Sequence, residues 1–118
     1  MSCADFIARS FAIRTAAHLA HLQSRSYAEH VALNEFYDRV LGLVDTFAES
    51  YQGMFAVVTS YPALTPPTGA PLVFLVDYLD WVKQNYASCT RGETALGAIL
   101  DEVMSTTAQT IYKLRNLK

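Results

Sequence analysis

The chain has 118 residues, of which 52% are hydrophobic and only 17% are charged, and its formal net charge is −2. A chain of this length can form one hydrophobic core, and so much apolar sequence in a small protein favours a homo-oligomer whose subunits cover part of that surface. The slight negative charge excludes a general attraction to phosphate backbones, and the cations of the last turn, Lys113, Arg115 and Lys118, are better explained by the helix dipole than by nucleic-acid binding.

The cysteines and the N-terminal charges predict a reduced, cytoplasmic protein. Cys3 and Cys89 lack a metal-type spacing, and two thiols do not indicate a disulfide framework. Charged residues interrupt the N-terminal apolar stretch, which is unlike a signal peptide, and no run approaches the about 18 apolar residues that a membrane span needs. We therefore expect neither secretion nor insertion into a membrane.

Two helices are expected in the N-terminal half. Apolar residues at three- and four-residue spacings predict a first helix from Ser2, as its N-cap, to about Gln23. Ser26 followed by Glu29 is a capping box that opens a second helix, and Gly53 is its expected end. Because so few residues separate the two helices, they should form an antiparallel hairpin.

The middle of the chain is expected to be a long link without helix. Its prolines and Gly69 exclude a regular helix between about Ser60 and Ala70, so this link must cross from one end of the molecule to the other. Pro71 is well placed as the first residue of a third helix, which should run to about Ala87.

A fourth helix completes the expected fold. Thr90 and Glu93 form a second capping box, and the apolar pattern continues from there to Leu114. The prediction is an all-α antiparallel four-helix bundle that is one domain over residues 1–118. A long crossover between the second and third helices is also the connectivity of ferritin-like bundles.

All three histidines fall where the first two helices meet. His18 and His21 are three residues apart on one side of the first helix, and folding of the hairpin places His30 near their level. Two interpretations stay open. The rings could converge as nitrogen ligands for a metal ion, or each could bond a backbone group or water at the end of the hairpin.

Two carboxylates on the second helix are candidate oxygen ligands. Asp45 and Glu49 lie one turn apart, a common arrangement for binding iron, manganese or zinc, and the apolar Phe47 and Ala48 between them predict a buried setting. His30 is about 22 Å from Asp45 along a helix that rises 1.5 Å per residue. A shared site would therefore join the histidines of one subunit to the carboxylates of another across a two-fold interface through the first and second helices.

The spacing of these residues resembles that of the Dps-like miniferritins, which are members of the ferritin-like superfamily. The positions that carry the resemblance, within residues 14–53, are His18, His30, Asn34, Asp45 and Glu49. The resemblance implies an inter-subunit site for iron, or for another divalent metal such as zinc or manganese, and oxidation of Fe(II). Residues 26–53 also resemble small proteins of tailed bacteriophages, which implies the host cytoplasm or the virion as the location.

The sequence departs from the miniferritin pattern at two of the ligand positions. Asn34 stands where the family has an aspartate and cannot supply an anionic ligand, and the shorter hairpin makes His21 an alternative to His18 as the first ligand. The leading hypothesis is a ferritin-like metal-binding protein, and the rival is a phage-related structural or assembly protein that keeps the bundle without the metal chemistry. The candidate metal ligands are His18, His21, His30, Asp45 and Glu49.

Overall fold

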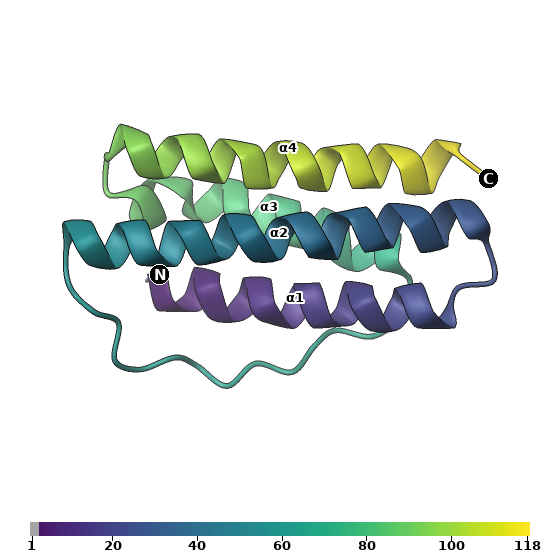
Figure 1. The fold of residues 1–118 in the computed structure, drawn as a ribbon, viewed down its shortest axis with the longest axis horizontal. Helices are drawn as coiled ribbons and strands as arrows, with labels where there is room; N and C mark the ends of the chain where they lie inside the picture. The colour runs from purple at the N-terminus through teal and green to yellow at the C-terminus, as the bar shows by residue number, and fades with distance from the viewer. Residues whose placement is uncertain (1–2) are drawn as a thin grey trace.

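The computed structural model describes residues 3–118, and within this range the chain forms four helices and no strand. The helices are α1 (Cys3–Gln23), α2 (Tyr27–Met54), α3 (Pro71–Thr90) and α4 (Thr94–Asn116) (Figure 1). They lie side by side in a bundle that measures 43 × 26 × 21 Å. The prediction of an all-α fold with four helices is confirmed. In this part of the chain no helix has the length and apolar character that crossing a membrane requires.

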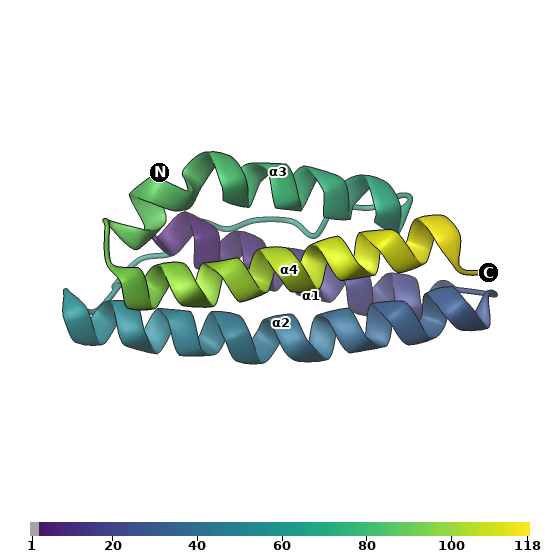
Figure 2. The same cartoon turned by 90° about the horizontal axis from the view of Figure 1, so that it is seen from above.

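Each helix packs against two neighbours. α1 and α4 both contact α2 and α3, and among the described residues the Cα atoms of the diagonal pairs, α1 with α4 and α2 with α3, do not come within 8 Å of one another. α2 and α3 run in one direction, whereas α1 and α4 run in the other (Figures 1 and 2). Every packed pair is therefore antiparallel.

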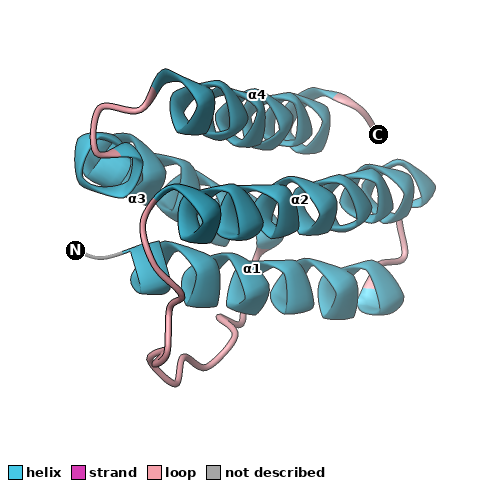
Figure 3. Ribbon diagram, turned by 60° about the vertical axis from the view of Figure 1, so that its left-hand side comes forward, coloured by secondary structure: helices cyan, strands magenta, loops and turns pink. Residues whose placement is uncertain are grey.

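The link between α2 and α3 contains no helix. Residues 55–70 run along the outer side of α1, from the end of α2 to the start of α3 (Figures 1 and 3). Prolines in this segment lack the N–H group that a helix requires, and Pro71 then begins α3 because a proline at the first helical position loses no hydrogen bond. Gln52 holds the start of the link, since its Oε1 accepts a hydrogen bond of 2.9 Å from the Val58 N–H.

A local hydrogen bond is found at each end of α2. The predicted N-cap is confirmed: the Ser26 hydroxyl oxygen accepts a hydrogen bond of 3.3 Å from the Glu29 N–H. The predicted end at Gly53 is wrong by one residue, because α2 continues to Met54 and the Phe55 N–H donates to the Tyr51 carbonyl. The other expected N-cap, Ser2, lies outside the described residues.

The turn between α3 and α4 differs from the prediction. Thr90 is not an N-cap but the buried last residue of α3, which extends three residues beyond its predicted end at Ala87. Arg91 (φ 52°) and Gly92 (φ 78°) then turn the chain in the left-handed region, and Glu93 precedes α4 without a side-chain cap. Packing explains the longer helix, because Cys89 and Thr90 are both buried.

Aromatic side chains dominate the core. The rings of Phe6 and Phe47 meet edge to face, with centroids 4.9 Å apart, and join α1 to α2. One turn further along α1 the Ser10 hydroxyl donates to the Phe6 carbonyl at 2.7 Å and pairs with the Tyr78 hydroxyl at 2.7 Å. This pairing gives the fully buried Tyr78 a hydrogen-bond partner, and burial raises the pKa of Tyr78 far above its ordinary value.

Phe47→Ala should lower the free energy of unfolding by about 3–5 kcal/mol, because it leaves a cavity opposite Phe6 in a packed core. Urea titration followed by circular dichroism measures the loss. The matched control is Tyr112→Ala on α4, where the ring is 58% exposed and the cost should stay below about 1 kcal/mol. Equal losses for the two variants would contradict this description of the core.

Stability should also fall in alkaline solution because of the two buried, free cysteines. Burial raises the pKa of Cys3 to about 12 and that of Cys89 to about 11, against an ordinary value of 9.0. The unfolded chain therefore ionises these thiols first, so their contribution to stability is complete below pH 9 and is lost as the pH rises toward 11 and 12. The double variant Cys3→Ala, Cys89→Ala should lose less stability between pH 8 and 10.5 than the parent in the same urea titrations. A parallel pH dependence in both proteins would contradict the assignment.

Candidate metal site at the hairpin of α1 and α2

The three histidines gather at the end of the bundle where α1 meets α2. The rings of His21 and His30 stack with centroids 3.6 Å apart and planes 18° from parallel. His18 lies one turn before His21, with 6.0 Å between their ring centroids, and stacks on Tyr37 at 4.1 Å. The short hairpin thus brings together the three residues that the sequence singled out.

His21 and His30 hold each other through reciprocal hydrogen bonds to backbone. Nδ1 of His21 lies 2.6 Å from the His30 carbonyl oxygen, and Nδ1 of His30 lies 2.9 Å from the His21 carbonyl oxygen. A carbonyl oxygen can only accept, so each Nδ1 carries a proton and donates it. In the neutral rings Nε2 is then the nitrogen with a free lone pair. The two open interpretations are therefore compatible, because Nδ1 bonds the backbone while Nε2 stays free to bind a metal ion.

The stacking of His21 on His30 limits how many of these two rings one metal ion can bind. A metal ion binds imidazole in the plane of the ring, at about 2.0–2.1 Å from the nitrogen. Two nearly parallel planes with ring centroids 3.6 Å apart cannot both contain one ion at that distance. One ion can therefore use His21 or His30 but not both. In agreement, residues 3–118 contain no group of three or more His, Cys, Asp or Glu side chains that could hold a metal.

Tyr37 is a member of this cluster that the sequence reasoning missed. Its ring supports His18 and meets His21 edge on, while its hydroxyl donates a hydrogen bond of 2.6 Å to Oδ1 of Asn34. The signal was present in the spacing, since His30, Asn34 and Tyr37 recur at four and three residues on one side of α2. Asn34 is thus already bonded within the cluster.

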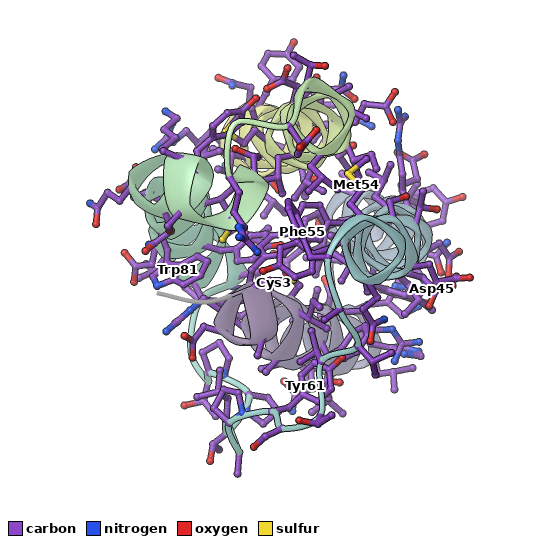
Figure 4. The ribbon with its side chains drawn as sticks, turned by 90° about the vertical axis from the view of Figure 1, so that its left-hand side faces the viewer. Cys3, Asp45, Met54, Phe55, Tyr61 and Trp81 are labelled. Atoms are coloured by element: carbon purple, nitrogen blue, oxygen red, sulfur yellow. The ribbon has the colours of Figure 1, made fainter. Side chains whose placement is uncertain are left out.

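The carboxylates lie elsewhere, and their predicted burial is wrong. Asp45 and Glu49 are exposed on α2, and Asp45 points away from the other three helices (Figure 4). The buried stripe of α2 contains Val44, Phe47 and Ala48, and residues next to these in sequence turn outward because successive helical positions differ by about 100°. α2 is continuous from the hairpin to Met54, so one chain cannot bring His30 to Asp45.

The tautomer of the stacked pair is directly measurable. At pH 8, ¹⁵N shifts from long-range proton–nitrogen correlation spectra should show His21 and His30 protonated on Nδ1 and unprotonated on Nε2. Free histidine serves as the reference because no backbone carbonyl holds its ring. Finding the proton on Nε2 in either residue would contradict the reciprocal bonds.

Comparison with known proteins assigns the chain to a family. The family model DUF5856, described as a family of unknown function, matches residues 21–114. No curated protein and no solved structure matches the chain. The matched segment extends from the end of α1 to the last turn of α4, which is most of the sequence. The chain therefore belongs to the DUF5856 family.

Proposed function

We propose that the protein is a ferritin-like bundle that pairs about a two-fold axis and binds a divalent metal ion, iron in the first place, between the paired subunits. The observation that carries the proposal is the fixed tautomer of His21 and His30, which leaves Nε2 free as a ligand. The path of residues 55–70 supports the ferritin-like assignment, since it spans the bundle and joins two parallel helices (Figure 1).

An outward stripe of α2 suits such a pairing. Its members recur at intervals of three and four residues from the hairpin onward: His30, Asn34, Asp38, Leu41, Asp45 and Glu49. If the α2 helices of two subunits lie antiparallel, with the axis crossing near Asp38, His30 of one subunit reaches the level of Asp45 of the partner subunit. His30 and Asp45, which are far apart within one chain, are then close together across the interface between the two chains.

Leu41 of this stripe and two side chains of α1 are apolar and exposed. Leu22 is 67% exposed on α1, and Phe11 and Leu41 are about 40% exposed on α1 and α2. Burial of one such side chain stabilises an association by up to about 1.5–3 kcal/mol. These residues therefore favour a partner on the face that carries the candidate ligands.

The donor set fits a divalent metal ion of intermediate hardness. One imidazole nitrogen and two carboxylates suit Fe(II), Mn(II) or Zn(II), and a pair of such ions would let Fe(II) react with dioxygen or peroxide. His18, the other candidate first ligand, is held by Tyr37 rather than by a backbone carbonyl. In this proposal the protein supplies the ligands and excludes bulk water from the ion.

One observation favours a second candidate function, an assembly protein without metal chemistry. Asn34 occupies the place of an anionic ligand, and its amide already bonds Tyr37 and, at 3.5 Å, Asp38. Under this alternative the same face pairs with a partner and the histidines only stabilise the hairpin. A measurement of metal binding decides between the two candidate functions.

The double variant Asp45→Asn, Glu49→Gln should abolish binding of Fe(II) under anaerobic, reducing conditions, because it removes anionic oxygen ligands at nearly constant volume. Titration calorimetry measures binding, and circular dichroism should show unchanged helix content. The control is Asp80→Asn with Glu102→Gln, which removes two exposed carboxylates from α3 and α4. A parent protein that pairs in solution but binds no Fe(II), Mn(II) or Zn(II) would replace this proposal by the assembly function.

A mixing experiment tests whether the site spans subunits. His30→Gln removes the ring nitrogen but keeps an N–H donor for the His21 carbonyl, so the hairpin should survive. Mixing this variant with the carboxylate variant after dissociation should restore about a quarter of the parental sites, because random pairing makes half the dimers mixed and each mixed dimer has one intact site. Zero recovery from two folded variants would contradict a metal site shared between subunits.

A further inference from the structure

A cavity of about 350 Å³ lies between α1, α3 and the link, away from the candidate metal site. α1 and α3 form two of its walls, and Leu64, Thr65 and Pro67 of the link line another side. In Figure 4, Trp81 lies on α3 beside α1. The side chains that line the cavity include Arg9, Ile13, Phe74, Asp77, Tyr78 and Trp81.

Arg9 brings a guanidinium group to this cavity. Its guanidinium carbon lies 4.7 Å from the centroid of the Trp81 ring, which holds the plane of the group in place. Nε of Arg9 is buried without a hydrogen-bond partner, and no ion pair joins Arg9 to another residue of the described chain. A carboxylate is the acceptor that best matches the planar guanidinium.

Asp77 supplies the opposite charge from the other wall. Its side chain is exposed at the cavity and forms no ion pair with Arg9. The cavity therefore offers one cationic and one anionic group that are not joined by a direct ion pair. An anion alone would meet repulsion from Asp77, whereas a ligand with an added ammonium group would be attracted to it.

The surface between the two charges is apolar. Ile13 and Phe74 contribute hydrocarbon, and Tyr78 contributes its ring because its hydroxyl is bonded to Ser10. The volume is at the lower end of the range of about 300–1,000 Å³ for small-molecule sites. The ligand must therefore be small and have a compact apolar group.

We propose that this cavity binds a small zwitterion with an apolar body, which is the chemistry of a free apolar α-amino acid. Its carboxylate binds Arg9, its ammonium group binds Asp77, and its side chain packs against Ile13 and Phe74. The site lies on the α3 side of α1 and does not depend on metal binding or on pairing of subunits.

The single tryptophan of the chain makes the proposal measurable, since Trp81 contacts Arg9 and all tryptophan emission comes from this wall of the cavity. L-Leucine added to the full-length protein should shift this emission with saturation. Isocaproate, which lacks the ammonium group, and isoamylamine, which lacks the carboxylate, should each bind at least about tenfold more weakly, because each loses one charge-assisted hydrogen bond. Phenylalanine and methionine extend the series to other side chains.

Two variants test which residue binds each charged group of the ligand. Calorimetry measures the same binding independently of the fluorescence. Arg9→Gln should remove the preference for leucine over isoamylamine, and Asp77→Asn should remove the preference for leucine over isocaproate. Arg39→Gln, on the exposed surface of α2, changes the charge equally and should bind as the parent does. The proposal is overturned if none of the three amino acids binds at millimolar concentration, or if both analogues bind the parent as tightly as leucine. The analogue series needs no variant, so the test stands even if a substitution disturbs folding.

Discussion

α2 is one uninterrupted helix of 28 residues, and its packing against both α1 and α4 constrains the whole molecule. Because the helix is rigid, the hairpin cluster at its start and the carboxylates near its end keep a constant separation and orientation. The buried stripe of α2 is occupied by the core, with Phe47 against Phe6. Whatever Asp45 and Glu49 bind must therefore approach from outside the chain.

The hairpin shows how one side chain can serve both structure and chemistry. His21 and His30 each use Nδ1 to donate a hydrogen bond to a backbone carbonyl at the junction of α1 and α2. The same bonds orient the rings and select the tautomer with a free Nε2. A structural role for these histidines is thus the arrangement that a metal ligand also needs, and it is not an argument against one.

α1 separates two surfaces of different chemistry. Toward α2 and solvent it presents His18 and exposed apolar residues, which suit pairing with another subunit. Toward α3 it presents Arg9 to a cavity that the link also borders. The link therefore has a role beyond connecting α2 to α3, since it contributes part of the lining of this cavity.

Local signals determined the helices, because capping and proline chemistry act within a few residues. The Ser26 hydroxyl marks the start of α2 and Pro71 the start of α3, and the short hairpin alone was enough to bring His18, His21 and His30 together.

Tertiary packing decided the features that depend on distant partners. Asp45 and Glu49 are exposed because α1 and α4 select which stripe of α2 is buried, and the apolar neighbours in sequence could not reveal that choice. Likewise α3 extends to Thr90 because burial of its last turn outweighs the capping signal there. Arg9 and Asp77 share a cavity only because α1 and α3 are packed side by side. Burial is a property of the assembled bundle, so the sequence names the chemical groups while the packing of the helices decides which of them meet.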